Sequence, residues 1–282
     1  MNRLLVSPSE LRERLDDPEC VVVDCRFQLG VPDAGQGAYL ESHIAGAVYA
    51  HLDHDLCGPI VPGSTGRHPL PSPEAAAATC GSWGIDEGVQ VVAYDATGGA
   101  LAAARLWWML RWLGHDRVAL LDGGWQAWQE SGGAVRNGEE RRQPRQFTAR
   151  VRESMVVTAD EVNRVRADAE WRVLDARAAD RFRGENETID AVAGRIPGAV
   201  SAPYGGTLSP AGRLLPPDAL QARFGPLMSG VSADHVVCYC GSGVTAALNV
   251  LALEHAGIGG ARLYAGSWSD WILDPRRPVA KG

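Results

Sequence analysis

The sequence has almost no lysine and no long apolar segment. Of its 27 basic residues, 26 are arginine, and Lys281 is the only lysine. Schiff-base catalysis, pyridoxal phosphate attachment and the Walker-loop grip on a nucleotide each need a lysine held inside the fold, so these chemistries are excluded. No apolar stretch approaches the roughly 18–20 residues of a membrane-spanning helix, and we expect no membrane partner. Arginine must therefore perform any anion binding.

A block of basic residues is also missing. The net charge is −7, and without a basic footprint we expect no nucleic-acid partner. The first residues, as far as Leu11, lack the apolar segment and cleavage site of a secretory leader, so we expect a cytoplasmic protein. The 282 residues suggest roughly two domains.

The cysteines show no metal-binding spacing. No CxxC pair with suitably spaced histidines is present, so we expect no metal. Without a leader the thiols are expected to be reduced, which leaves open whether one of them is a nucleophile. The six are Cys20, Cys25, Cys57, Cys80, Cys238 and Cys240.

The two halves of the chain repeat each other at four places in the same order. Four collinear matches indicate a tandem duplication rather than chance. In chain order the matched segments are 21–26 with 172–177, 43–48 with 195–200, 90–95 with 235–240, and 120–128 with 263–271.

Each half alternates short β-branched runs with longer helical patterns. This alternation predicts an α/β fold, with a mainly parallel sheet in each half and helices on both of its faces. Helix-start signals occur at Ser7–Glu10 and again at Thr158–Glu161, which supports the repeat. A polar, charged stretch separates the halves, so we predict domains at 1–135 and 156–282 joined by a linker at 136–155.

Cys240 follows a predicted strand at 236–239 and precedes a predicted helix at 246–255. The intervening loop, Gly241–Thr245, contains two glycines that let successive N–H groups converge on one point. Together with the helix N-terminus, such a cradle favours the reactive thiolate. The alternative is a small buried residue after a strand. Cys238 lies in an apolar run and is expected in the core, and the other four cysteines lack a glycine loop.

A cysteine phosphatase would need an arginine six residues after its nucleophile to bind the phosphoryl oxygens. Position 246 is Ala246. The loop therefore lacks the arginine that a cysteine phosphatase needs, and the sequence does not support that function.

The Cys240–Thr245 loop, CGSGVT, resembles the active loop of the mercaptopyruvate branch of the tandem rhodanese sulfurtransferases. The segment 264–271 resembles the C-terminal motif of that family, and 39–47 resembles its N-terminal motif, with Ala45 where proline is usual. The resemblance implies an inactive first rhodanese domain and a catalytic second one, in which Cys240 cycles through a persulfide. Asp95 stands where the repeat of the first half matches Cys240. A carboxylate cannot accept a sulfane sulfur, so this residue supports an inactive first domain.

The resemblance also implies the donor site. Arg181 matches the principal anion-binding position, and a planar guanidinium suits a carboxylate. The loop residues expected to line the substrate site are Gly241, Gly243, Val244 and Thr245. Arg177 and Arg183 are expected to be structural or to support the residues that contact the donor.

Family members contribute an aspartate and a histidine from the first domain to the catalytic site, and Asp53 and His68 occupy matching contexts. With Ser242 they are expected to form a relay that moves the thiol proton and stabilises the pyruvate enolate. The alternatives are an exposed loop histidine and a capping aspartate.

At one position the sequence differs from the mercaptopyruvate enzymes in a way that affects which donor it would bind. The mercaptopyruvate enzymes carry a second arginine nine residues after the first, where this chain has Asp190, and a carboxylate there is expected to repel an anionic donor. Thiosulfate enzymes resemble CRKGVT and use two loop cations, which Gly241 and Ser242 do not supply. Arg195, in place of the histidine usual before Ile-Pro-Gly, offers a cation from another side.

The resemblance thus implies a sulfurtransferase that moves a sulfane sulfur from 3-mercaptopyruvate to cyanide, a small thiol or thioredoxin, without a cofactor. Thiosulfate as the donor remains an alternative. A non-catalytic binding or sulfur-carrier module is a more remote one, because a scaffold has no need for the difference between Cys240 and Asp95.

Overall fold

The computed structural model describes residues 3–282 and divides the chain into two compact units. The first unit comprises the residues up to Gly58 together with Pro71–Arg152 and Pro210–Leu214. The second comprises Pro59–Leu70, Glu153–Ser209 and Leu215–Gly282. The segment that carries Arg67 and His68 therefore belongs to the second unit, although its sequence neighbours belong to the first.

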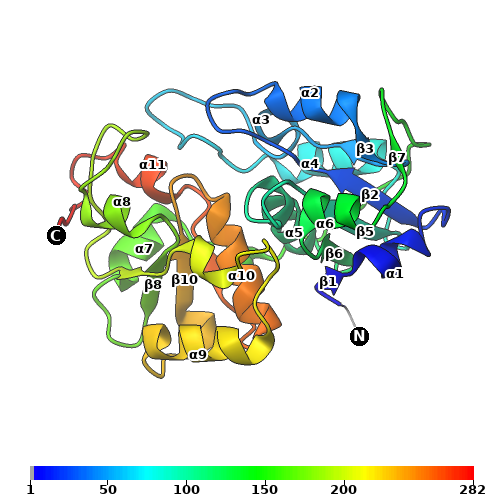
Figure 1. Cartoon of the computed structure of the whole chain (residues 1–282). Helices are drawn as coiled ribbons and strands as arrows, with labels where there is room; N and C mark the ends of the chain where they lie inside the picture. Colours follow the sequence, from blue (N-terminus) through cyan, green and yellow to red (C-terminus); the bar gives the residue numbers. More distant parts are fainter. Residues whose placement is uncertain (1–2) are drawn as a thin grey trace. The chain divides into compact units, whose positions relative to one another are not determined.

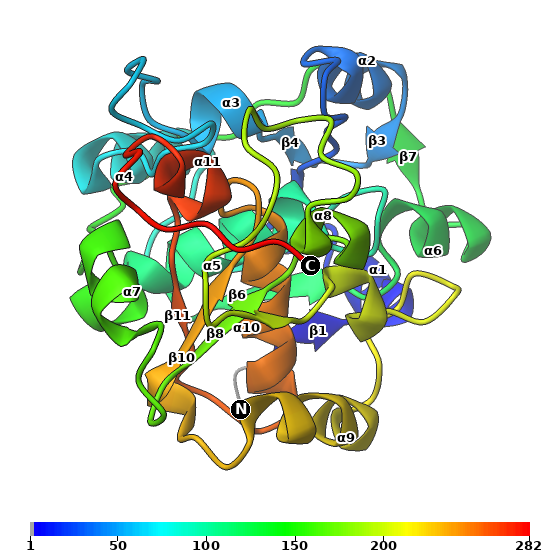
Figure 2. The same ribbon diagram turned by 90° about the vertical axis from the view of Figure 1, so that its left-hand side faces the viewer.

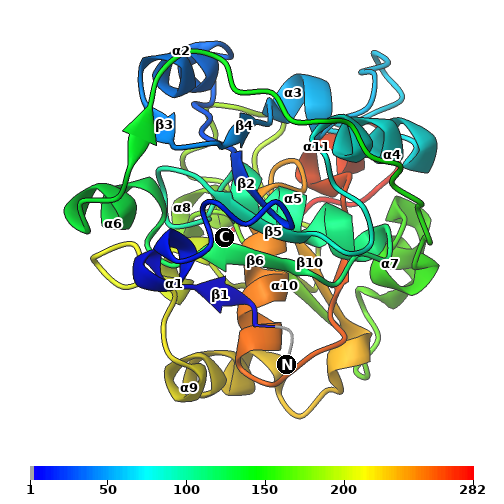
Figure 3. The ribbon, with the colours of Figure 1, turned by 90° about the vertical axis from the view of Figure 1, so that its right-hand side faces the viewer.

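The first unit contains a parallel sheet with the strand order β1–β6–β5–β2–β4, which Figure 3 shows from one side. A separate antiparallel pair joins β3 (His43–Ile44) to β7 (Val135–Arg136). The strands of the parallel sheet are β1 (Leu5–Val6), β2 (Cys20–Asp24), β4 (Val48–Tyr49), β5 (Gln90–Tyr94) and β6 (Val118–Leu121).

Helices cover this sheet because its strands are apolar on both faces. Val22 and Val92 pack with α1 and α6 in one cluster, and since side chains alternate along a strand, Val21 and Val91 point to the opposite face. There α5 packs against β5 and β6. The helices of the unit are α1 (Pro8–Arg12), α2 (Ala34–Glu41), α3 (Leu52–Asp55), α4 (Pro73–Ser82), α5 (Ala102–Trp112) and α6 (Gly124–Glu130).

The second unit repeats this plan with a parallel sheet in the order β11–β10–β8–β9. Val237 and Tyr239 face a cluster that includes Trp268 and Trp271, and α10 packs against β10 and α9, as Figures 1 and 2 show. The strands are β8 (Arg172–Asp175), β9 (Val200–Ser201), β10 (Val236–Tyr239) and β11 (Arg262–Leu263). The helices are α7 (Ala159–Val165), α8 (Ala179–Arg183), α9 (Pro217–Met228), α10 (Thr245–His255) and α11 (Ser267–Trp271), with 3₁₀ turns at Glu153–Met155, Tyr204–Thr207 and Ala233–His235.

The expected α/β class is confirmed. Both capping boxes form, at Ser7 with Glu10 and at Thr158 with Glu161. Along residues 3–282, no helix combines the length and the apolar character that a membrane crossing requires.

Each unit carries the same buried ion pair directly after its first long strand. Asp24 accepts hydrogen bonds from Arg26 Nε at 2.9 Å and Nη2 at 2.7 Å, and the Arg26 guanidinium lies over Trp125. Asp175 and Arg177 repeat this arrangement, with an Nη2–Oδ2 distance of 2.6 Å and Trp268 beneath the guanidinium. The pair ties the strand end to the helix that follows the last strand of its sheet.

We predict that Arg26→Met lowers the free energy of unfolding by about 3–5 kcal/mol, because it leaves the Asp24 carboxylate buried without a counter-charge. The matched control is Arg136→Met, which breaks an exposed pair with Glu140 and should cost less than about 1 kcal/mol. Urea unfolding followed by circular dichroism measures both, and equal losses would contradict a structural role for the buried pair.

Candidate active site

The loop after β10 places the Cys240 thiol at the N-terminus of α10. Cys240 is 2% exposed, and its Sγ accepts a hydrogen bond from the Gly243 N–H at 3.2 Å. Gly243 has a φ of +75°, and a Cβ there would lie 2.2 Å from the Ala265 carbonyl oxygen. Only glycine therefore lets the backbone turn back towards the sulfur.

The segment that begins α11 fixes the same loop. The Cys240 N–H donates to Ser267 Oγ at 3.0 Å, and the Trp268 N–H donates to the Cys240 carbonyl at 3.0 Å. Ser267 is fully buried with a φ of +54°, a conformation that costs a serine energy. Sequence reasoning assigned Ser267 no role, although the repeat matches it to Gly124, whose φ is +58°. A serine where the other half has glycine is a signal for a side chain that is needed.

Ser242 and His68 are brought together as expected. His68 Nδ1 and Ser242 Oγ lie 2.7 Å apart, and both residues are buried. Asp53 lies in the first unit on α3, where its N–H donates to His51 Nδ1 at 3.1 Å. Its part in the relay stays a prediction.

Arg181 lies on α8 in a network of buried carboxylates. Its Nη2 lies 2.9 Å from both Glu187 Oε1 and Asp190 Oδ2, and Nε also donates to Glu187. Burial alone would raise the pKa of Glu187. The N–H of Asp190, the Arg181 guanidinium and the N–H of Ile189 outweigh it and hold that pKa below its usual value. Glu187 is therefore an ionised partner that orients Arg181.

Sequence reasoning missed Arg67. Its Nη1 forms an ion pair with Asp190 Oδ1, and its N–H donates to Ser269 Oγ at 3.0 Å. Asp190, expected to repel an anionic donor, is instead neutralised by Arg67 and Arg181. No spacing rule could have found this pair, because its members are 123 residues apart.

The guanidiniums of Arg67 and Arg181 approach Gly241, the residue that follows Cys240. A Cβ built on Gly241 would lie 2.9 Å from Arg67 Nη2 and 3.7 Å from Arg181 Nη1. The bare backbone of Gly241 thus leaves the space that these cations occupy.

The other arginines of this region have further partners, although Arg177 Nη1 also lies 3.5 Å from Glu187 Oε2. Arg177 is buried against Asp175, and although burial lowers its pKa, the hydrogen bonds and charge of Asp175 outweigh that effect and raise it. Arg183 pairs with Glu185 at the surface. Arg195, considered as a compensating cation, donates instead to the Gly282 carbonyl at 2.5 Å and lies over Phe182.

Burial makes the other five thiols poor nucleophiles. It is the main cause that raises the pKa of Cys238 and Cys80 to about 12 and that of Cys57 to about 11. It also raises the pKa of Cys20 and Cys25. None of these five lies in a glycine loop, so Cys240 is the thiol placed for chemistry.

The matching loop of the first unit holds a carboxylate in its cradle. Asp95 Oδ1 accepts from the N–H groups of Thr97 and Gly99, each at 2.8 Å. Asp95 Oδ2 accepts from the N–H groups of Leu101 at 3.0 Å and Ala103 at 3.3 Å. This cradle is therefore filled by its own side chain and offers no sulfur acceptor.

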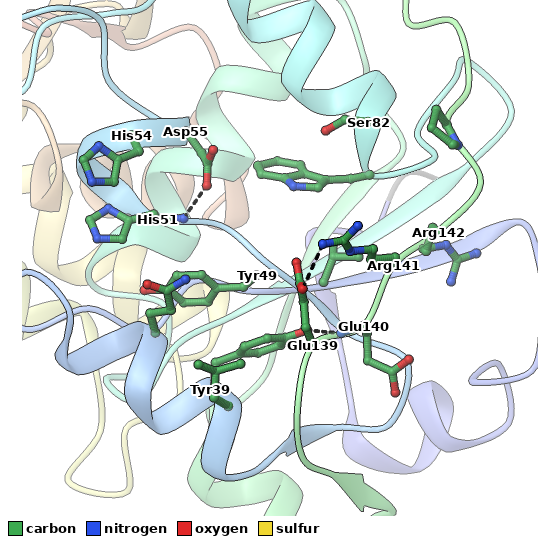
Figure 4. A pocket seen from close by; sticks show the side chains of 15 residues that line it. Tyr39, Tyr49, His51, His54, Asp55, Ser82, Glu139, Glu140, Arg141 and Arg142 are labelled. Atoms are coloured by element: carbon green, nitrogen blue, oxygen red, sulfur yellow. Dashed lines mark hydrogen bonds and ion pairs between the residues drawn. The ribbon is translucent and has the colours of Figure 1, made fainter.

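Figure 4 shows a pocket of about 740 Å³ in the first unit. Its polar groups are partly bonded to one another: Arg141 pairs with Glu139, and the Tyr39 hydroxyl accepts from the Glu140 N–H at 2.9 Å. No cysteine lines it. Among residues 3–282, no group of three or more His, Cys, Asp and Glu side chains could hold a metal ion.

We predict that Asp95→Asn lowers the free energy of unfolding by about 1.5–3 kcal/mol, because the acceptor loses its charge and the two N–H groups that donate to the replaced oxygen lose their acceptor. Asp33→Asn is the control, since Asp33 is exposed and makes no capping hydrogen bond. Urea unfolding measures both. A loss in Asp95→Asn no larger than in the control would show that the carboxylate does not hold the loop.

We predict a pH dependence of stability from Glu187. Its folded-state pKa lies below the usual 4.5, so the stabilisation it provides is present above the unfolded-state pKa and is lost as the pH falls through the folded-state pKa. Glu187→Gln should be less stable than the parent near neutral pH, and the difference should shrink below about pH 4.5. Urea unfolding of both proteins across that range tests this. A difference independent of pH would contradict it.

Comparisons with known proteins agree with this geometry. The sequence profile of the rhodanese-like domain matches residues 7–131 and 158–274. A Pseudomonas aeruginosa protein named a probable 3-mercaptopyruvate sulfurtransferase is 48% identical, over 99% of this chain and 98% of its own. A Mycobacterium tuberculosis protein provisionally named a thiosulfate sulfurtransferase is 39% identical, over 99% and 98%.

A solved structure is also similar. The 3-mercaptopyruvate sulfurtransferase from Leishmania major superposes with a TM-score of 0.83 at 33% identity, over 95% of this chain and 74% of that one. The likeness therefore covers nearly the whole of this chain.

Proposed function

The chain belongs to the rhodanese family of sulfurtransferases, and we propose that it moves a sulfane sulfur from 3-mercaptopyruvate to a thiophilic acceptor through a persulfide on Cys240. The observation that carries this proposal is the Cys240 thiol at the N-terminus of α10, with an N–H donor on its sulfur and two guanidiniums at Gly241. Such a site suits a thiolate that attacks an anionic sulfur donor.

In the first half-reaction the Cys240 thiolate attacks the sulfur of 3-mercaptopyruvate. An S–S bond forms, the C–S bond breaks, and its electron pair passes to C3 of the donor as the enolate of pyruvate. The enolate takes up the proton that the thiol group of the donor gives up, so that pyruvate leaves and a Cys240 persulfide anion stays. The Gly243 N–H, which donates to the Cys240 sulfur, and the N-terminus of α10 favour the negative charge of the persulfide as they favour that of the thiolate.

Ser242 and His68 are the proposed proton carriers of this step. Their hydrogen bond of 2.7 Å lets the hydroxyl pass a proton to the enolate while the imidazole takes one from the donor thiol. Asp53 is proposed, from the sequence resemblance, as a third member of this relay.

In the second half-reaction an acceptor attacks the outer sulfur, and the thiolate of Cys240 leaves. Cyanide becomes thiocyanate in this step, and a thiol becomes a persulfide. A small thiol or reduced thioredoxin as the acceptor and a cytoplasmic location remain predictions from the sequence. No step needs a cofactor.

The site favours 3-mercaptopyruvate, a carboxylate, over thiosulfate. The cations near Cys240 are the guanidiniums of Arg67 and Arg181, and no cationic side chain stands in the Gly241–Thr245 loop itself. Glu187 and Asp190 hold Arg181 through its Nε and Nη2, and its Nη1, which lies towards Gly241, can donate charge-assisted hydrogen bonds to a carboxylate. The second candidate is thiosulfate, which the name of the Mycobacterium tuberculosis relative favours.

We predict a higher kcat/KM with 3-mercaptopyruvate than with thiosulfate when cyanide is the acceptor, because Gly241 and Ser242 supply no loop cations for a dianion. Steady-state thiocyanate formation with each donor measures the ratio. A preference for thiosulfate would overturn the donor assignment and leave the persulfide chemistry intact.

We predict that Cys240→Ser abolishes turnover with either donor, since a hydroxyl is far less nucleophilic at neutral pH. Cys57→Ser is the matched control, because Cys57 is buried outside the loop with a pKa raised to about 11, and it should stay active. Substantial turnover by Cys240→Ser would end the persulfide mechanism.

A further inference from the structure

We propose that Arg67 is the second cation of the donor site, and that Arg67 and Arg181, bridged by Asp190, hold the carboxylate of the sulfur donor beside Cys240. The inference rests on the proposed function, because it assigns a binding role within that reaction. It concerns a residue that the repeat and the loop motif leave without a role.

The backbone of Arg67 is fixed to the catalytic loop. Its N–H donates to Ser269 Oγ at 3.0 Å, and the Ser269 N–H donates to the Gly241 carbonyl at 2.9 Å. A Cβ on Gly66 would lie 2.7 Å from that same Oγ and 2.8 Å from the Gly266 carbonyl oxygen. Only a glycine before Arg67 allows this close approach, so one serine sets the distance between Arg67 and the loop.

Asp190 aligns the two arginines. One of its oxygens pairs with Arg67 Nη1, and the other lies 2.9 Å from Arg181 Nη2. A carboxylate that bridges two guanidiniums overcomes the repulsion between their charges. Asp190 thus stabilises the pair of cations.

The charges of this cluster are not equally accessible. The Asp190 and Glu187 side chains are each 2% exposed, whereas those of Arg67 and Arg181 are 29% and 16% exposed. An incoming anion therefore meets guanidinium N–H groups, while the balancing carboxylates lie behind them.

Gly241 brings these N–H groups towards the nucleophile. Arg67 Nη2 would lie 2.9 Å from a Cβ at this position, and both Nη atoms of Arg181 would lie within 3.8 Å. Arg67 Nε is buried and has no hydrogen-bond partner in the part of the chain that the structure describes. A side chain at position 241 would displace Arg67, so Gly241 and Arg67 together set the donor specificity.

The test compares Arg67→Met with Arg183→Met, which removes an arginine of the same region that pairs only with Glu185 at the surface. With 3-mercaptopyruvate and cyanide, Arg67→Met should lose roughly 10- to 100-fold in kcat/KM, as expected for charge-assisted hydrogen bonds. The loss should lie mainly in KM. Pyruvate should also become a weaker competitive inhibitor, while Arg183→Met should match the parent in each measurement.

A charge swap tests the Arg67–Asp190 pair by a gain of activity, while KM and inhibition by pyruvate report binding. Arg67→Asp should lose activity, and Arg67→Asp with Asp190→Arg, which exchanges the ends of the ion pair, should recover at least tenfold of that loss. Recovery of activity in the double variant requires only that one guanidinium remains beside Arg181. The double variant therefore stays informative even if Arg67→Met folds poorly. Circular dichroism and thermal unfolding report folding.

If the parent protein is active with 3-mercaptopyruvate and a folded Arg67→Met variant is equally active, Arg67 has no role in donor binding. The same conclusion follows if the charge swap restores no activity. Either result leaves the proposed function standing. A parent that turns over thiosulfate but not 3-mercaptopyruvate would overturn the proposed donor and, with it, this inference.

Discussion

The arrangement of the second unit depends on how the residue at the end of β10 is held. Cys240 lies where the backbone leaves the sheet and α10 begins, and its N–H and carbonyl are both bound by the first residues of α11. These bonds fix the loop to the end of a neighbouring strand. The sulfur, the Gly243 N–H and the Ser242 hydroxyl therefore keep their places relative to one another before any substrate arrives.

The first unit shows what the same position does without a thiol. Asp95 fills its own cradle with four N–H donors, and Gly124 replaces the buried serine at the start of the last helix. The loop thus binds a carboxylate in the first half, and in the proposed reaction it stabilises the reactive thiolate of the second half. This difference between two copies of one fold is the physical argument for a single catalytic domain.

The fold and the position of Cys240 could be predicted from the sequence, whereas the partners of the charged side chains depend on long-range contacts. The strand at 236–239, the glycine loop and the repeat are local patterns, and the structure has them where they were predicted. The charge cluster is not local. Asp190 read alone predicts repulsion of an anion, because nothing in the sequence reveals that Arg67, 123 residues away, will neutralise it. Arg195 was considered for that role, but its side chain donates to the Gly282 carbonyl.

The central claim is that Cys240 accepts a sulfur atom from 3-mercaptopyruvate. It is tested most directly by intact-mass spectrometry of the protein after a single addition of that donor without an acceptor, together with the amount of pyruvate released. A gain of one sulfur atom, located on the peptide that contains Cys240 and matched by an equal amount of pyruvate, is the predicted result. Pyruvate release without added mass, or a sulfur atom on another cysteine, would contradict the account.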